Sequence, residues 1–223
     1  MVHAIILAGG RSSRLPGDTL KQYRRINNDK MLITYSIEAF IQNSKVDSIT
    51  VVVEDEAWED LIRGDIAKRG LPLDKLQAPF WKARIYNRQS SVVEGIKASY
   101  DWRNFCENDI SDEDVVIIHD ASRPGITEEM IDKCLEAMSG SEGVVLVNNH
   151  NEQTPAAFNA KKYYQANRAL VNKVDFDSID ELSMPAINGG MNVKKIDGYD
   201  NPNINEESDF VAFEEKMRQS KVS

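Results

Sequence analysis

Short apolar runs alternate along this chain with longer segments in which apolar residues recur every three or four positions. Four of the runs are rich in β-branched residues and lie at 4–8, 48–53, 114–119 and 143–147. Continuous apolar runs of this length are typical of strands that are buried on both faces of a sheet. The sequence therefore predicts four interior strands.

Helical periodicity marks the segments 31–42, 90–100 and 128–138, and again the segment 208–219 near the end of the sequence. Strands that alternate with helices form a mostly parallel sheet covered by helices on both faces. No internal repeat or low-complexity linker divides the sequence. We therefore predict an α/β fold with a doubly wound, Rossmann-like sheet, in one domain over 1–223.

The composition excludes several classes of protein. Of the 223 residues, 41% are hydrophobic and 28% charged, which is enough for a sizeable core in a soluble protein. No apolar stretch approaches 18 residues, and the N-terminus lacks a basic leader, so we expect neither a membrane span nor a signal peptide. A net charge of −9 disfavours nucleic acid as a partner. Cys106 and Cys134 have no metal-ligand spacing, which favours a reduced, cytoplasmic protein.

The first predicted strand leads into a loop of small and basic residues. The loop begins at Gly9 and Gly10, carries Arg11 and Arg14, and closes on Lys21. Small residues let backbone amides approach an anion, and the basic side chains supply the positive charge that a triphosphate needs. We interpret this loop as a nucleotide-phosphate site.

The loop matches neither of the two commonest phosphate-binding motifs. A P-loop ends in Gly-Lys-Ser/Thr, whereas Gly10 is followed here by Arg11-Ser12, and the turn has two glycines where a dinucleotide fingerprint needs three. The alternative interpretation is an ordinary strand-to-helix turn with basic residues on the surface.

A second candidate loop follows the predicted strand 114–119. Asp120 stands directly at the end of this apolar run, where a carboxylate is costly unless it is paired or holds a cation. The carboxylate of Asp120 could bind Mg²⁺ or accept a hydrogen bond from a ribose hydroxyl, and Arg123 could bind a phosphate. The alternatives are that Asp120 caps a helix beginning near Thr127 or forms a structural pair with Arg123.

A third candidate element is the start of the predicted helix at 90–100. Ser90 or Ser91 there could use its hydroxyl and the free backbone amides to read a base or bind phosphate, although a serine N-cap is ordinary in any helix. In parallel sheets, ligands bind where the carboxyl ends of the strands meet, so the loops after 4–8 and 114–119 should lie at one edge.

Taken in order, five segments resemble the 2-C-methyl-D-erythritol 4-phosphate cytidylyltransferase family, which includes relatives acting on ribitol 5-phosphate and other polyol phosphates. The segments are AGGRSSR…LKQY, RQSSVVEGI, IHDASRP, QTPAAF and DNPNINEESDF. The resemblance runs from Ala4 to about Glu214. It implies a single nucleotidyltransferase domain of the nucleotide-diphospho-sugar transferase type, in which an acceptor phosphate attacks the α-phosphorus of CTP and pyrophosphate leaves with Mg²⁺ as cofactor. It also implies a cytoplasmic role in making isoprenoid or cell-surface polysaccharide precursors.

The resemblance also implies a role for individual residues. Arg14 and Lys21 would stabilise the reacting phosphorus and the leaving pyrophosphate, Asp120 would orient ribose or metal, and Arg123 would support the loop. The remaining implied residues are Ala8, Gly9, Gly10, Arg11, Ser12, Ser90 and Ser91 for the nucleotide, Thr154, Asp180 and Glu181 for the acceptor, and Asp120 with Asp200 for the metal.

Three departures from the family pattern stand out, the first beside the expected cytosine site and the other two at the expected acceptor site. Arg84-Ile85 replaces a Gly-Gly pair before the third segment, no extended arm follows Pro124, and Asn203 replaces a lysine that would face a phosphate. We therefore expect an unusual small phosphorylated alcohol as acceptor, and a homodimer, if formed, without the family's arm. Possible substitutes for the lost lysine are Lys82, Arg84, Lys173 and Lys194. The rival functions are a sugar-phosphate nucleotidyltransferase that uses another nucleoside triphosphate and a non-catalytic nucleotide-binding homologue.

Overall fold

A twisted sheet forms the centre of the protein in the computed structural model, which describes residues 1–10, 19–78, 80–82, 88–101, 103–148, 153–171 and 182–220. Within this part of the chain the sheet has seven strands in the order β5-β4-β1-β6-β8-β7-β9. Their bounds are β1 (Val2–Ala8), β4 (Ser48–Val53), β5 (Trp81–Lys82), β6 (Val115–Asp120), β7 (Gly143–Val147), β8 (Gln153–Asn159) and β9 (Val193–Asp197). The four apolar runs are confirmed as β1, β4, β6 and β7.

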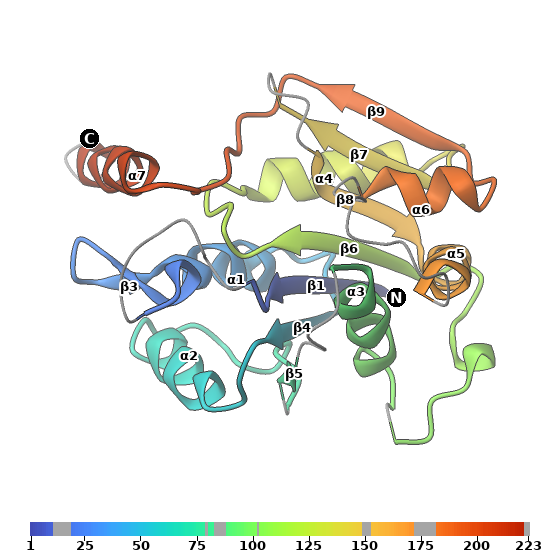
Figure 1. Ribbon diagram of the computed structural model, residues 1–223, viewed down its shortest axis with the longest axis horizontal. Helices are drawn as coiled ribbons and strands as arrows, with labels where there is room; N and C mark the ends of the chain where they lie inside the picture. Colours follow the sequence, from blue (N-terminus) through green and yellow to red (C-terminus); the bar gives the residue numbers. More distant parts are fainter. Residues whose placement is uncertain are drawn as a thin grey trace.

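The sheet is mostly parallel, as predicted, with one strand reversed. β1 pairs in parallel with β4 and β6, and β9 pairs in parallel with β7 (Figure 1). β8 lies between β6 and β7 and is antiparallel to both. The carboxyl ends of β1, β4, β6 and β7 therefore all lie at one edge of the sheet.

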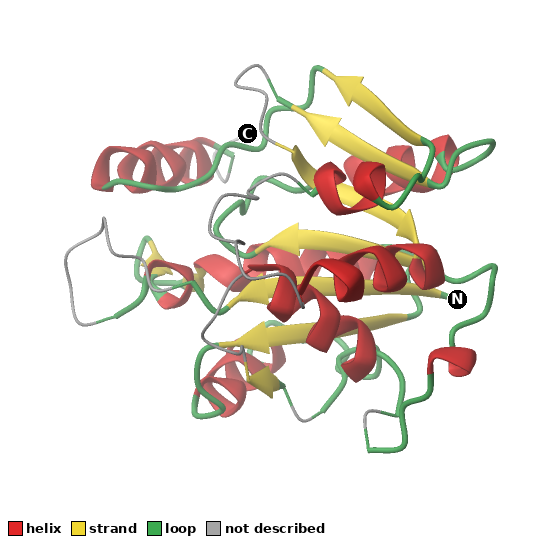
Figure 2. Cartoon of the chain, turned by 45° about the vertical axis from the view of Figure 1, so that its right-hand side comes forward, coloured by secondary structure: helices red, strands yellow, loops and turns green. Residues whose placement is uncertain are grey.

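Helices cover both faces of the sheet (Figures 1 and 2). Along β1, Ala4, Ile6 and Ala8 belong to one buried cluster and Ile5 to the other, because alternate side chains of a strand point to opposite faces. The first face carries α1 (Leu32–Gln42), α2 (Trp58–Ala67) and α4 (Glu128–Ala137), and the second carries α3 (Arg88–Ala98), α5 (Ala160–Val171) and α6 (Ser183–Asn188).

A glycine fixes the position of α3 against the sheet. A Cβ atom at Gly95 would lie 2.5 Å from Cγ2 of Ile5 and 3.1 Å from Cγ2 of Val52, so only glycine lets the helix approach this closely. The close approach places the first turn of α3, which begins at Arg88, beside the carboxyl edge of the sheet.

A smaller layer stands at the carboxyl edge. It comprises the 3₁₀ turn η1 (Lys21–Tyr23), the hairpin of β2 (Arg25–Ile26) and β3 (Lys30–Met31), and the helix α7 (Glu207–Gln219). Ile26, Leu32, Ile204 and Phe210 form its buried cluster. A second 3₁₀ turn, η2 (Glu107–Asp109), precedes β6. None of the described helices is long and apolar enough to cross a membrane.

Candidate functional site

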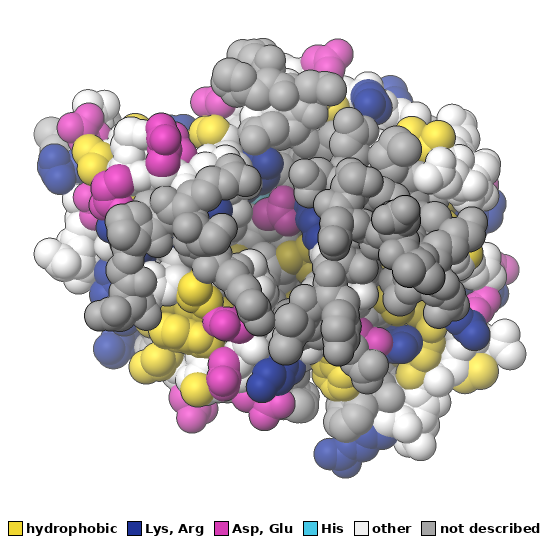
Figure 3. Space-filling view, in the orientation of Figure 1, with side chains coloured by type: hydrophobic (Ala, Val, Ile, Leu, Met, Phe, Trp, Pro, Cys, Tyr) yellow, Lys and Arg dark blue, Asp and Glu magenta, His cyan; other side chains and the backbone are white. Residues whose placement is uncertain are grey.

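The three candidate elements meet at the carboxyl edge. β1 ends at Ala8, β6 ends at Asp120, and α3 begins at Arg88. In the space-filling view, acidic and basic side chains lie next to one another in a hollow near the middle of the face that is turned to the viewer (Figure 3). The prediction that the loops after β1 and β6 lie at one edge is therefore confirmed.

Asp120 lies between two arginines. Nη2 of Arg88 donates to both carboxylate oxygens at 2.8 Å, and Nε of Arg123 lies 3.6 Å from Oδ2. Burial favours the neutral acid, but the positive charges of Arg88 and Arg123 outweigh it and hold the pKa of Asp120 below its usual range. Asp120 is therefore an ionised carboxylate. It does not cap α4, whose first turn is capped by the hydroxyl of Thr127.

Arg88 was not among the predicted site residues. The sequence did contain a signal, because a carboxylate at the end of a buried strand needs a compensating cation. The nearest candidate along the chain was Arg123, three residues away, whereas Arg88 reaches Asp120 from another element, 32 positions earlier.

The ring of His119, in β6, contacts the backbone of the loop that follows Asp120. It is fully buried, with Nε2 3.0 Å from the hydroxyl of Ser36 and 3.1 Å from the carbonyl oxygen of Arg123. Burial lowers the pKa of His119 to about 4, so the ring is neutral at pH 7. Its Nδ1 lies 3.2 Å from the hydroxyl of Thr154, which is itself buried. Thr154 therefore contacts His119, the neighbour of Asp120 in β6, and its predicted role in acceptor binding stays a prediction.

The glycine turn after β1 is held by Gln22. Its side-chain amide donates to the carbonyl oxygens of Ala8 at 2.7 Å and Gly10 at 2.9 Å, and Tyr23 also donates to Ala8 at 3.1 Å. Among the described residues, none has an atom within 4 Å of a Cβ built at Gly10. Gln22 and Tyr23 thus fix the backbone carbonyl groups of the turn.

Lys21 points to the C-terminal part of the chain. Its ammonium group donates to the carbonyl oxygen of Ile204 at 2.6 Å and lies 3.3 Å from Oδ1 of Asn203 and 3.4 Å from Oδ1 of Asn205. Asn203, where the resemblance led us to expect a lysine, therefore contacts Lys21. The same segment binds Arg123, whose Nη1 donates to the carbonyl oxygen of Asn201 at 3.1 Å.

The remaining predicted site residues lie in α3, in the C-terminal part of the chain or outside the described residues. Ser90 is buried and Ser91 half-buried in the first turn of α3, which begins two residues before the predicted start. Asp200 is exposed, just before the segment that contacts Lys21. Seven candidate site residues named from the sequence lie outside the described part of the chain: Arg11, Ser12, Arg14, Arg84, Lys173, Asp180 and Glu181.

The described residues offer a Mg²⁺ ion few ligands. Among the described residues, no three acidic, histidine or cysteine side chains form a cluster that could hold a metal. Mg²⁺ commonly binds through one or two carboxylates together with substrate phosphates and water. Asp120 is an ionised carboxylate and fits that requirement, with both oxygens shared with Arg88.

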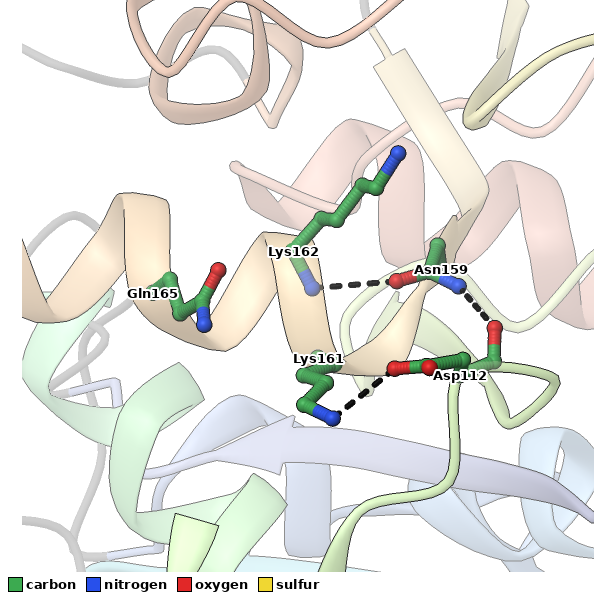
Figure 4. Close-up of a pocket in the computed structure, with 5 residues that line it drawn as sticks. All are labelled: Asp112, Asn159, Lys161, Lys162 and Gln165. Carbon is green, nitrogen blue, oxygen red and sulfur yellow. Dashed lines mark hydrogen bonds and ion pairs between the residues drawn. The ribbon is translucent and has the colours of Figure 1, made fainter. Parts of the chain in front are cut away.

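A polar pocket lies at the opposite edge of the sheet. It is lined by Asp112, Asn159, Lys161, Lys162 and Gln165 around the start of α5 (Figure 4). Lys161 is paired with Asp112, and Lys162 with Glu142. This pocket holds none of the predicted site residues.

Comparisons with known proteins agree with the geometry. A family model described as 2-C-methyl-D-erythritol 4-phosphate cytidylyltransferase matches residues 2–150. An enzyme of that name from Lachnospira eligens is 28% identical over 234 residues, which cover 93% of this chain and 95% of the relative. A ribitol-5-phosphate cytidylyltransferase from Vibrio parahaemolyticus is 27% identical, with 94% of this chain and 93% of the relative covered.

Two further matches concern length and fold. A bifunctional enzyme from Rhizorhabdus wittichii is 26% identical over 97% of this chain, but the chain spans only 56% of that relative's length. The crystal structure of a 4-diphosphocytidyl-2C-methyl-D-erythritol synthase from Anaerococcus prevotii superposes with a TM-score of 0.71 at 17% identity, covering 97% of this chain and 96% of that one. This likeness confirms the predicted Rossmann-like nucleotidyltransferase fold.

Proposed function

Because the chain belongs to the 2-C-methyl-D-erythritol 4-phosphate cytidylyltransferase family, we propose that it transfers CMP from CTP to a small polyol phosphate and releases pyrophosphate. The single observation that carries the proposal is the arrangement at the carboxyl edge. Arg88 and Arg123 flank the ionised Asp120, and Arg123 and Lys21 both donate to the backbone of the segment 201–204. Such a set suits a polyanionic substrate.

The proposed reaction needs charge stabilisation more than proton transfer. A phosphate oxygen of the acceptor attacks the α-phosphorus, a new P–O bond forms, and the bond to the bridging oxygen of the leaving pyrophosphate breaks with its electron pair. The attacking oxygen is already anionic, so no residue has to act as its base. Lys21 and Arg123 would stabilise the charge that spreads over the phosphate oxygens.

Mg²⁺ would neutralise phosphate charge when bound, and Asp120 is the carboxylate that could hold it. Because Arg88 occupies both oxygens of Asp120, it would also keep this carboxylate ionised and oriented. The predicted residues Ser90 and Ser91 in the first turn of α3 would face the nucleotide, where a hydroxyl can bond the cytosine. Within a cytoplasmic setting, the acceptor would be a methylerythritol 4-phosphate-like compound, ribitol phosphate or glycerol phosphate.

The test is pyrophosphate release with Mg²⁺, each of the four nucleoside triphosphates and a panel of polyol and sugar phosphates. We expect release with CTP and a polyol phosphate. Lys21→Met should lower kcat by at least about 10²-fold, the scale for removing one preorganised transition-state contact. The matched control is Lys45→Met, which removes an exposed lysine paired with Asp132 and should leave turnover unchanged.

Two other results would replace the proposal. Release with a different nucleoside triphosphate and a sugar phosphate would identify the rival nucleotidyltransferase. Calorimetric binding of CTP without release for any acceptor would identify a non-catalytic nucleotide-binding protein. Near-normal turnover of Lys21→Met would refute the role of that lysine even if the reaction were found.

A further inference from the structure

The segment 200–205, which we call the C-terminal strap, lies against both loops that carry basic side chains. At one end, the carbonyl oxygen of Asn201 accepts a hydrogen bond from Nη1 of Arg123 at 3.1 Å. Further along, the carbonyl oxygen of Ile204 accepts one from Nζ of Lys21 at 2.6 Å. One short segment therefore contacts two cations that lie about a hundred positions apart in the sequence.

The strap is itself fixed to the Asp120 loop and to α7. The amide of Ile204 donates to the carbonyl oxygen of Ser122 at 2.9 Å. The amides of Asn205 and Glu206 donate to the carboxylate of Asp209 in the first turn of α7, at 2.8 and 3.0 Å. These contacts fix the backbone from Ile204 onward relative to the site.

A second anchor joins α7 to the turn that carries Lys21. Arg24 follows Lys21 by three residues and donates two hydrogen bonds of 2.7 Å to the carboxylate of Glu207. Its guanidinium also stacks over the ring of Phe210, 4.0 Å from the centroid. The strap and the Lys21 turn are therefore held together independently of the lysine's own contacts.

The oxygens of the C-terminal strap that contact Lys21 are all neutral. The carbonyl of Ile204 and the side-chain amides of Asn203 and Asn205 orient the ammonium and add no negative charge beside it. The two asparagine contacts, at 3.3 and 3.4 Å, are longer than a normal hydrogen bond to nitrogen and therefore weak. Phosphate oxygens form shorter, charge-assisted bonds and can replace them.

We propose that Asn203 and Asn205 are positioning residues. They hold the ammonium group of Lys21 in place before the nucleotide binds, and the phosphate oxygens of the nucleotide then replace them as its partners. The proposal rests on the cytidylyl transfer proposed above. It assigns no contact with the reacting atoms to the asparagines, which act only through Lys21.

A double-mutant cycle tests this dependence. The Asn203→Ala/Asn205→Ala variant should have a kcat about threefold to fivefold lower than wild type, since two long hydrogen bonds contribute at the low end of the usual range. In the Lys21→Met background the same two substitutions should leave kcat unchanged, because the group through which they act is gone. Equal losses in both backgrounds, or no loss in either, would overturn the proposal.

A second measurement does not depend on activity. Trace acetylation followed by mass spectrometry reports how accessible Lys21 is, with Lys45 as the internal reference. We expect the Asn203→Ala/Asn205→Ala variant to label faster at Lys21 than wild type and equally at Lys45. Unchanged labelling at Lys21 would overturn the role of the asparagines. Absence of pyrophosphate release from wild type with every nucleotide would instead refute the proposed function, while the labelling still decides whether the strap holds the lysine.

Discussion

Replacing Arg88 by methionine should destabilise the protein in a pH-dependent way. The substitution keeps an unbranched side chain of similar length in α3 but removes both 2.8 Å hydrogen bonds to Asp120. Hydrogen bonds to a charged group contribute about 1.5–3 kcal/mol when well made. The two side chains are 22% and 21% exposed, and Arg123 remains near, so we expect a loss toward the low end, about 1–2 kcal/mol at pH 7.

The pH dependence follows from the lowered pKa of Asp120. A carboxylate whose pKa is lowered on folding stabilises the folded state above its unfolded pKa and loses that contribution as the pH falls through the folded value. Arg88 is a main cause of the lowering. The difference in free energy of unfolding between wild type and Arg88→Met should therefore shrink as the pH is lowered from 7 through about 4 toward 3.

Equilibrium unfolding in urea at pH 7, 5, 4 and 3 measures this difference. The matched control is Arg168→Met, which removes an exposed ion pair with Glu107 and should cost less than about 1 kcal/mol. A loss for Arg88→Met no larger than for the control, or a larger loss that is the same at every pH, would refute the assignment of Arg88 as the partner that keeps Asp120 ionised.

Two further predictions concern the surroundings of the site. Wild type should lose about 2 kcal/mol between pH 7 and pH 5 from His119, because its pKa is lowered to about 4 and the unfolded state binds a proton there that the folded state does not. His119→Gln should lack that part of the slope in urea unfolding, and an unchanged slope would contradict a neutral buried ring. Gly125→Ala should destabilise by about 1–2 kcal/mol, because its Cβ would lie 3.0 Å from Oδ1 of Asn201 in the C-terminal strap. Both Gly125→Ala and its control are measured by urea unfolding. The control is Gly64→Ala, whose Cβ meets no described atom within 4 Å and which should be neutral or stabilising.

The sequence predicted the strands that can be recognised from their own residues alone. β1, β4, β6 and β7 are apolar and β-branched, and all lie inside the sheet. β8 is also an interior strand, but its sequence QTPAAFN contains a proline, which cannot donate to a neighbouring strand. The pairing of β8 with β7 shifts register at this point, between Val145 and Val147. Tertiary pairing thus accommodates a residue that argues against a strand in sequence-based reasoning.

The site could be predicted in part for the same reason. Asp120 and Arg123 stand in one loop, and the position of that loop follows from the strand before it. The pairing of Asp120 with Arg88 depends on how closely α3 packs against β1, which Gly95 decides and which no spacing in the sequence expresses. The contact between Lys21 and Asn203 likewise depends on where the chain returns after the whole sheet is built.

The hydrogen bond from Lys21 to Ile204 has a consequence for the order of folding. The two residues are 183 positions apart, and β1, β4, β6, β7, β8 and β9 are all formed by the chain between or before them. Closing so long a loop is costly in entropy until the intervening strands have paired and brought its ends together. The turn that carries Lys21 should therefore reach its native position late in folding. In a refolding experiment the secondary-structure signal should recover before the protection of Lys21 from acetylation does.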